Sequence, residues 1–376
     1  MTNFSFRENH LFNILNSFDL QKGALDNFLR HYFRAHKALG SKDRRFISET
    51  VYGLFRWRGL LDYLCDKPIS WEKRYFLYAR INPLDYLHQQ EIPPHVRVSF
   101  PKSFFELLSH SLGEEKAFDF CIFCNAPAPT TVRANFLKTT REELLTKWQH
   151  DFPISACKYS PLGITFHRKL NFFELPEFRE GLFEIQDEAS QLVASLVNAQ
   201  PGDHVLDFCA GSGGKTLAFA PKMKNKGLIY LYDNRPTILE EAKKRLGRAG
   251  VHNAQIISSD DRKRGLQGKM HWVLVDAPCT GSGTLRRNPD GKWKFDCASL
   301  ERSILAQRAI FAEALSFLRP DGHIVYATCS VLPQENSEQI AFFEKNFNLK
   351  CLQPPFQSFL EKEGMDGFFG AVLKRY

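Results

Sequence analysis

An alternation of strand-like and helix-like segments begins after Gly181 and continues to the end of the chain. Short runs rich in β-branched residues, such as 271–277 (HWVLVDA) and 323–329 (HIVYATC), are separated by segments with apolar residues at helical spacing, of which 184–199 is the first. Strands joined by helices pair in parallel, because a parallel pair needs a long crossover. The pattern therefore predicts a doubly wound α/β domain over 181–376, with about seven strands and helices on both faces.

The residues before Gly181 differ in character. Residues 1–95 carry aromatic and aliphatic side chains at helical spacing with few glycines or prolines, which predicts an all-α domain. Residues 96–180 predict connector helices and then a small α+β subdomain, whose helix is expected to begin at a Thr140 cap. A chain of 376 residues is long enough for these two or three domains.

Composition and charge limit the classes of function. The chain is 43% hydrophobic and 24% charged, which is typical of a soluble globular protein, and its net charge of +8 favours a polyanion such as nucleic acid as partner. Its start has no basic region before a long apolar stretch, and no window approaches the roughly 18 apolar residues that span a bilayer. We therefore expect a cytoplasmic protein that does not bind membranes.

The nine cysteines are an odd number scattered along the chain, which favours reduced thiols over a disulfide framework. Cys121 and Cys124 form a CxxC, but no second pair that could complete a zinc site lies nearby, so we expect no metal. Two other cysteines, Cys279 and Cys329, follow predicted strands. Parallel sheets bind ligands at the carboxyl ends of their strands, so both thiols should face one crevice, although burial is the commoner fate of a cysteine.

A glycine-rich turn, DFCAGSGGKT, follows the first predicted strand of the α/β domain. Gly211, Gly213 and Gly214 let the backbone approach a ligand and lead into a helix with free amides. The spacing fits neither the phosphate loop GxxxxGK[ST] nor the dinucleotide motif GxGxxG. Asp233 and Asp260 close the next two strands, where carboxylates can bind a ribose and an adenine. These features predict S-adenosylmethionine, an adenosine cofactor without pyrophosphate; solvated acids at strand ends are the alternative.

Basic residues gather in two further stretches. Residues 41–58 (SKDRRFISETVYGLFRWR) place several cations around one helix, and a phosphate-binding surface and a solvated face fit this equally well. The loop after Cys279 has cations on both sides of an aromatic ring, which suits the phosphates and an unpaired base of a single-stranded nucleic acid; a merely solvated loop is the alternative. Its residues are Arg286, Arg287, Lys292, Trp293 and Lys294.

Five motifs, in order, resemble those of the RNA 5-methylcytosine methyltransferases of the RsmB (Sun) group. They are DFCAGSGGKT, LYDN, DAPCTGSGTLRRNPDGKW, the helix containing Gln307, and YATCSVLPQENSEQI. The resemblance covers 130–376, and KDRRFISETVYGLFRWRGLLDYL is similar to the group's NusB-like RNA-binding domain, here shortened after Leu64. It implies a Rossmann-like class I S-adenosylmethionine-dependent methyltransferase domain after a small α+β subdomain and an all-α NusB-like domain. The implied protein is a monomeric RNA (cytosine-5-)-methyltransferase that acts on small-subunit ribosomal RNA.

The resemblance also implies roles for individual residues. Cys329 of the TCS motif would add to the sixth ring carbon of cytosine, and Cys279 of the DAPC motif would help to break the adduct down. Asp276 would hold the cytosine edge beside the cofactor, and Lys215 would lie in the same pocket. The implied cofactor contacts are Cys209, Ala210, Gly211, Ser212, Gly213, Gly214, Lys215, Asp233, Asp260 and Asp276. In two departures, Gly211-Ser212 stands where many relatives have Ala-Pro, and the third-strand acid is doubled as Asp260-Asp261.

Three other functions fit the sequence less well. A DNA cytosine methyltransferase would use Cys279 and leave Cys329 unnecessary, and the N-terminal likeness to an RNA binder also argues against it. An RNA-binding ribosome assembly factor without activity is disfavoured, because both cysteines, Lys215 and Asp276 are all present. A cysteine hydrolase would need a histidine and an acid as partners, and neither thiol has a recognisable pair in the sequence.

Overall fold

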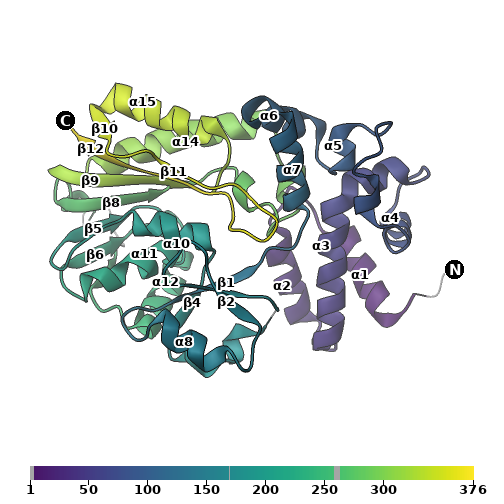
Figure 1. Cartoon of the computed structure of the whole chain (residues 1–376), viewed down its shortest axis with the longest axis horizontal. Helices are drawn as coiled ribbons and strands as arrows, with labels where there is room; N and C mark the ends of the chain where they lie inside the picture. Colours follow the sequence, from purple (N-terminus) through teal and green to yellow (C-terminus); the bar gives the residue numbers. More distant parts are fainter. Residues whose placement is uncertain (1–3, 169, 258–262) are drawn as a thin grey trace. The chain divides into compact units, whose positions relative to one another are not determined.

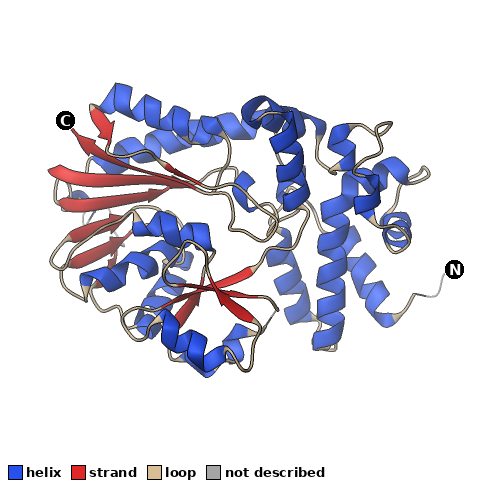
Figure 2. Cartoon of the chain, viewed as in Figure 1, coloured by secondary structure: helices blue, strands red, loops and turns tan. Residues whose placement is uncertain are grey.

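The structure is a computed structural model that describes residues 4–168, 170–257 and 263–376. The chain divides into two compact units: Met1–Pro127 with Thr284–Ser299, and Ala128–Gly283 with Leu300–Tyr376. Figure 2 shows helices alone in the first unit and the strands in the second. The helical unit therefore takes residues from two widely separated stretches of the chain.

The helical unit confirms the prediction that the N-terminal residues are helical. Along its longest helix, α3, the side chains of Ile47, Val51 and Leu54 are 0% exposed and recur every three or four residues, so α3 buries one face. Its α-helices are α1 (Phe6–Ser17), α2 (Leu25–Ala35), α3 (Ser41–Leu64), α4 (Trp71–Tyr78), α5 (Pro94–Arg97), α6 (Lys102–Leu112) and α7 (Glu114–Cys124).

The segment Thr284–Ser299 is packed inside this helical unit. The Lys292 side chain is 1% exposed, and its ammonium donates hydrogen bonds to the backbone carbonyl of Arg56 at 2.7 Å and to Oδ1 of Asn125 at 2.6 Å. Burial lowers the pKa of Lys292 to about 7. Lys292 therefore acts here as a buried donor that joins the segment to α3 and to the residue after α7.

Two further residues of the segment are packed in the same way. The indole N–H of Trp293 donates to the backbone carbonyl of Phe55 at 2.7 Å, and Arg286 is 1% exposed. Arg286 and Lys292 are therefore buried, so both the prediction that they bind the phosphates of a nucleic acid and the alternative of a solvated loop are wrong for these two residues. Trp293 is partly buried, and its stacking on a base stays a prediction. A run of cations does not show which of them will be buried, and here Lys292 is buried against one backbone carbonyl and one side-chain oxygen.

The second unit contains a small antiparallel sheet with strand order β2-β3-β1-β4. The Thr140 cap is confirmed, because its hydroxyl accepts from the Glu143 amide at 3.2 Å while the Glu143 carboxylate accepts from the Thr140 amide at 3.0 Å. Residues 183–185 form a strand, so the helix predicted over 184–199 was placed too early. The elements are β1 (Thr130–Ala134), α8 (Arg141–Trp148), β2 (Ile154–Ala156), β3 (Gly163–Phe166), α9 (Pro176–Arg179) and β4 (Phe183–Ile185).

The large sheet has eight strands in the order β10-β12-β9-β8-β5-β6-β7, with β11 paired to β12. Strands β5 to β9 pair in parallel and β12 is antiparallel to β9, so the doubly wound fold is confirmed. The strands are β5 (His204–Asp207), β6 (Leu228–Leu231), β7 (Ala254–Ile256), β8 (Met270–Asp276), β9 (Leu318–Thr328), β10 (Leu349–Cys351), β11 (Phe356–Gln357) and β12 (Phe369–Arg375). The helices are α10 (Glu188–Ser195), α11 (Gly214–Phe219), α12 (Pro236–Ala249), α14 (Cys297–Leu315) and α15 (Ser337–Phe347).

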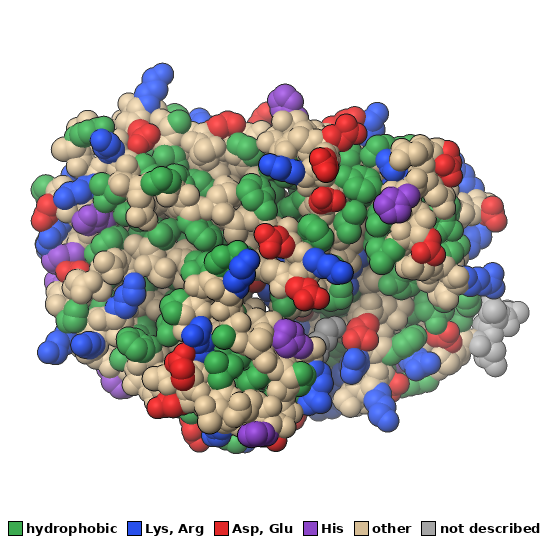
Figure 3. Space-filling view, in the orientation of Figure 1, with side chains coloured by type: hydrophobic (Ala, Val, Ile, Leu, Met, Phe, Trp, Pro, Cys, Tyr) green, Lys and Arg blue, Asp and Glu red, His purple; other side chains and the backbone are tan. Residues whose placement is uncertain are grey.

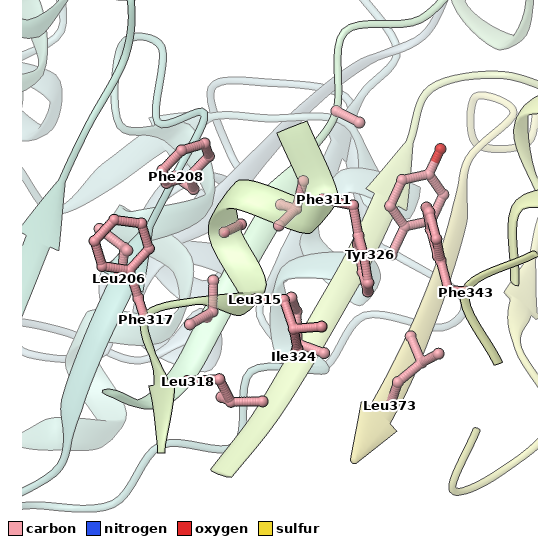
Figure 4. Close-up of a cluster of buried hydrophobic side chains, with 14 of the residues drawn as sticks. Leu206, Phe208, Phe311, Leu315, Phe317, Leu318, Ile324, Tyr326, Phe343 and Leu373 are labelled. Carbon is pink, nitrogen blue, oxygen red and sulfur yellow. The ribbon is translucent and has the colours of Figure 1, made fainter. Parts of the chain in front are cut away.

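Helices cover both faces of this sheet, with α14 and α15 on one side and α10 to α12 on the other (Figure 1). Alternate residues of β8 enter opposite cores: Val273 and Val275 pack with α14 and α15, and Leu274 packs with α11 and α12. Figure 4 shows the first core, in which the rings of Phe311 and Phe343 stack at 3.7 Å. Each fully buried side chain of this size contributes about 1.5–3 kcal/mol, so the two cores fix the strand ends in place.

Acidic and basic side chains lie interspersed on the face shown in Figure 3. In the part of the chain that the structure describes, no helix has the length and apolar character to cross a membrane. Cys121 and Cys124 are both buried in α7. Among the residues that the structure describes, no three or more His, Cys, Asp or Glu side chains form a cluster that could hold a metal ion.

Candidate active site

Cys279 and Cys329 lie together at one edge of the large sheet. They follow the neighbouring parallel strands β8 and β9, in which Asp276 lies opposite Ala327. Their sulfur atoms are 3.4 Å apart and both residues are partly exposed. The prediction that the strand ends bring the two thiols to one place is confirmed.

The two loops that carry these thiols are bonded directly to each other. The Ser282 and Ser330 hydroxyls are 2.9 Å apart, and the Gly283 amide donates to the carbonyl of Cys329 at 2.9 Å. A Cβ atom at Gly283 would lie 1.9 Å from the carbonyl oxygen of Gly367, so only glycine allows this approach. The spacing of the thiols is therefore set by backbone contacts as well as by the sheet.

A buried carboxylate, Glu335, holds the first loop. It is 0% exposed, and it accepts hydrogen bonds from the Thr280 amide at 2.9 Å, the Thr280 hydroxyl at 2.6 Å and Nε2 of Gln307 at 2.9 Å. Thr280 is the residue after Cys279, so Glu335 positions that thiol. Glu335 is not among the site residues predicted from the sequence; the available signal was Gln307, a polar residue one helical turn before the core residue Phe311.

The two thiols differ in acidity. The hydrogen bond between them lowers the pKa of Cys329 and raises that of Cys279 well above its ordinary value, with Cys329 as the acceptor. Burial raises the pKa of both thiols. The negative charge of Asp276 also raises that of Cys329, and the positive charge of Lys215 opposes Asp276 by lowering it. Cys329 is therefore the thiol that more readily becomes the nucleophilic thiolate.

Lys215 and Asp276 form an ion pair at the same edge. The ammonium of Lys215 lies 2.5 Å from Oδ2 of Asp276 and 5.3 Å from the centre of the Phe368 ring. Burial alone would lower the pKa of Lys215, but the negative charge of Asp276 outweighs it and the pKa is raised. The lysine is therefore a fixed positive charge beside Cys329.

The glycine turn adopts backbone conformations that favour glycine. Gly211 has φ 51° and Gly213 has φ 77°, both in the left-handed region. A Cβ atom at Gly213 would lie 3.2 Å from the Cβ of Ala242 in α12, whereas beside Gly211 the nearest group is the Arg235 guanidinium at 4.0 Å. The turn is thus closely packed against α12 at Gly213 and open at Gly211.

The side chains of Arg245 and Gln186 form hydrogen bonds that hold the glycine turn in place. Arg245 of α12 donates to the carbonyl of Ser212 at 2.9 Å and to its hydroxyl at 2.7 Å, and it also forms an ion pair with Glu184 at 2.9 Å. Nε2 of Gln186 donates to the carbonyl of Gly214 at 3.3 Å. These contacts restrain the backbone of the turn at Ser212 and Gly214.

Asp233 lies beside the glycine turn and is held by it. Its Oδ2 accepts from the Gly211 amide at 2.9 Å, and its carboxylate accepts from the Arg235 amide and guanidinium at 2.9–3.0 Å. Burial raises its pKa, but the bonds from Arg235 and Gly211 outweigh burial and the pKa is lowered. Asp233 is therefore ionised. Asp260, the other strand-end acid expected at the cofactor, lies outside the described residues.

Two more polar groups lie beneath the turn. Asp207 is 1% exposed, accepts from the Thr216 hydroxyl at 2.6 Å, and has a pKa that burial raises to about 7. Within the described ranges its second oxygen, Oδ1, has no hydrogen-bond partner. Burial also raises the pKa of Cys209, which is consistent with a packed thiol rather than a reactive one.

The residues at this edge fit S-adenosylmethionine. The open backbone at Gly211 leaves room for a ligand against the turn, and the ionised Asp233 can accept hydrogen bonds from ribose hydroxyls. The Arg235 guanidinium lies on that carboxylate and its side chain is 63% exposed, so it can swing into solvent when a ribose binds. The glycine turn and Asp233 are thus the parts that would hold the cofactor.

Comparisons with known proteins agree with this geometry. Residues 194–374 match the family model of the 16S rRNA methyltransferase RsmB/F. The ribosomal RNA small subunit methyltransferase B of Enterobacter sp. (strain 638) is 36% identical over 413 residues, which cover 89% of this chain and 91% of the relative. The chain belongs to the RsmB/F methyltransferase family. Its cofactor is accordingly S-adenosylmethionine.

Other relatives and structures extend the comparison. The RsmB of Proteus mirabilis is 32% identical, and its alignment covers 67% of this chain and 60% of that protein. A methyltransferase homolog from Pyrococcus horikoshii has a TM-score of 0.65 at 26% identity over 78% of this chain and 99% of its own. NSun6 from Pyrococcus horikoshii, solved with SFG, has the same TM-score at 21% identity over 73% of this chain and 98% of its own, and shows the shared fold.

Proposed function

We propose that this RsmB/F enzyme transfers a methyl group to carbon 5 of a cytosine in small-subunit ribosomal RNA. The names of the relatives support the RNA substrate. The observation that carries the reaction is the pair of thiols 3.4 Å apart, one with a lowered pKa and one with a raised pKa, beside the Lys215 ammonium. Carbon 5 of cytosine is a poor nucleophile, so a reaction there needs covalent activation.

Cys329 supplies that activation. Its thiolate forms a bond to carbon 6 of the ring, and the electrons of the 5,6 double bond move to make carbon 5 nucleophilic. S-adenosylmethionine supplies the methyl group. The hydrogen bond from Cys279 favours the Cys329 thiolate before the attack, and Lys215 opposes the negative charge of Asp276, which disfavours it. Asp276, whose side chain is 30% exposed, accepts a hydrogen bond from the exocyclic amino group of the base.

Cys279 acts after methyl transfer. Once Cys329 is a thioether it is no longer an anion that accepts a hydrogen bond, so the interaction that raised the pKa of Cys279 is lost. Cys279 can then lose its own proton to solvent and, as a thiolate, take the proton from carbon 5. The electrons of that C–H bond restore the 5,6 double bond, the bond from carbon 6 to sulfur breaks, and Cys329 leaves as a thiolate.

Cysteine variants test this division of labour. With tritiated S-adenosylmethionine and a small-subunit ribosomal RNA transcript, Cys329→Ala should give neither methylation nor a covalent complex. Cys279→Ala should instead accumulate an RNA–protein complex that survives denaturant. Cys297→Ala, which changes an exposed thiol at the start of α14, is the control and should behave as wild type.

The outcomes also separate the alternatives. Exchanged phenotypes of the two variants would support a DNA-type cytosine methyltransferase that attacks with Cys279, and a DNA duplex as the preferred substrate would do the same. RNA binding without methyl transfer by the wild type would point to an assembly factor. Retention of a fully formed thiol pair and ion pair argues against such a loss of activity.

We further propose that residues 1–95 bind RNA, that 96–180 form connector helices and a small α+β subdomain, and that 181–376 carry catalysis, in a cytoplasmic monomer. Lys42 and Arg45 are exposed at the start of α3, where they can reach phosphates. Replacing both with Ala should weaken RNA binding and flatten its dependence on salt concentration. Unchanged binding would remove this helix from the RNA site.

A further inference from the structure

We propose that Cys279 and Cys329 form a site of reversible oxidation, at which a peroxide converts the two thiols into an intramolecular disulfide that stops catalysis. A thiol reductant would restore the pair. The loss of catalysis rests on the proposed function, whereas the disulfide itself depends only on the geometry of the two sulfur atoms.

The geometry of the pair carries the inference. The sulfur atoms are 3.4 Å apart, so they need to approach by about 1.4 Å to reach the disulfide bond length of about 2.05 Å. Rotation of the side chains supplies such a movement. The loops cannot drift apart, because the Gly283 amide bonds to the carbonyl of Cys329 and the hydroxyls of Ser282 and Ser330 are in contact.

The chemistry follows in two balanced steps. The Cys329 thiolate attacks hydrogen peroxide: a sulfur–oxygen bond forms, the oxygen–oxygen bond breaks, and the hydroxide that leaves is protonated to water. Cys329 is now a sulfenic acid. The Cys279 sulfur then attacks the Cys329 sulfur: a sulfur–sulfur bond forms, the sulfur–oxygen bond breaks, and the hydroxide takes the Cys279 proton to leave as a second water. Two thiols are oxidised and one peroxide is reduced.

The surroundings favour this pair over the other cysteines. Both thiols are partly exposed, and the Lys215 ammonium beside them stabilises the thiolate that reacts with peroxide. Cys121 offers the contrast, because it is fully buried in α7 and burial raises its pKa well above the ordinary value. Cys297 is exposed, but it lies outside this pair of strand ends.

The pairing also protects the enzyme. A sulfenic acid without a neighbouring thiol is oxidised further to a sulfinic acid, which thiol reductants do not reverse. Cys279 intercepts Cys329 at the first stage, so the oxidised protein remains recoverable. The residue that releases the RNA in the catalytic cycle therefore also rescues the nucleophile.

Peroxide treatment of the full-length protein tests the inference. In wild type, two of the nine thiols should be lost, and a non-reduced digest should contain a peptide that joins Cys279 to Cys329. Methylation of the RNA should fall roughly a hundredfold or more and return with dithiothreitol. Cys297→Ser, the control, should give the same disulfide and the same recovery.

The Cys279→Ser variant provides the decisive comparison. Peroxide should leave its Cys329 as a sulfenic acid that dimedone captures, and excess peroxide should abolish formation of the RNA complex in a way that dithiothreitol does not reverse. A wild-type protein in which Cys329 becomes a sulfinic acid while Cys279 stays free would overturn the proposal. If the disulfide forms but the reduced wild-type enzyme methylates no RNA, the proposed function fails and the oxidation site stands.

Discussion

Glu335 gives the sharpest test of how the two cysteine loops are held. Its buried carboxylate accepts three hydrogen bonds, two from Thr280 and one from Gln307. A hydrogen bond to a charged group contributes about 1.5–3 kcal/mol, and a donor left buried without a partner costs about 1–3 kcal/mol. Because the three bonds share one carboxylate, Glu335→Ala should lower the free energy of unfolding by about 3–5 kcal/mol rather than by their full sum.

The variant Glu335→Gln separates the loss of charge from the loss of an acceptor. The amide oxygen can still accept from the Thr280 amide and Gln307, and the amide nitrogen can donate to the Thr280 hydroxyl, so the expected loss is only about 1 kcal/mol. Glu338→Ala, in the exposed first turn of α15, is the control and should change stability by less than about 0.5 kcal/mol. Urea denaturation followed by circular dichroism measures all three. A Glu335→Ala protein as stable as the control would refute the reasoning.

Three further predictions concern charge near the cofactor. Lys215→Met should raise the pKa of Cys329 and move the rising limb of the pH–rate profile to higher pH; an unmoved limb would contradict this. The pKa of Asp207 rises from 3.8 to about 7 on folding, so the protein should lose about 4 kcal/mol of stability as pH rises across that interval. Urea titrations at several pH values should show that Asp207→Asn removes this loss. A variant whose stability falls with pH as steeply as that of wild type would count against the prediction. Arg245→Met should weaken the binding of S-adenosylmethionine about tenfold, while the exposed Lys244→Met should not, as measured by calorimetry. Equal affinities of the two variants would show that Arg245 does not support the glycine turn.

The sequence predicts the large sheet and the meeting of the thiols well, because both depend on periodic patterns. Residues 271–277 and 323–329 alternate between two cores, and a parallel pairing then brings the strand ends together. Cys279 and Cys329 need only to follow those strands by a few residues to meet. Local patterns therefore determine this part of the site.

Other parts depend on contacts that no local pattern reveals. The burial of Lys292 depends on carbonyl and amide oxygens more than 160 residues away in the chain. The carboxylate of Asp233 accepts hydrogen bonds from Arg235, two residues later in the chain. Recognising Asp233 as an acid at the end of a strand does not predict this contact. Residues 183–185 become a strand because β1 offers an edge to pair with, and this pairing outweighs their similarity to the helix that follows.

The insertion of Thr284–Ser299 into the helical unit constrains how such a protein can evolve. A domain encoded by one continuous stretch can be gained or lost by a single fusion or deletion of a gene fragment. Here, a cut after Pro127 would leave Lys292 and Trp293 in the catalytic half without the carbonyls that receive their N–H groups. The two halves of this gene should therefore be inherited together, and a stable catalytic fragment would need both residues redesigned for exposure to water.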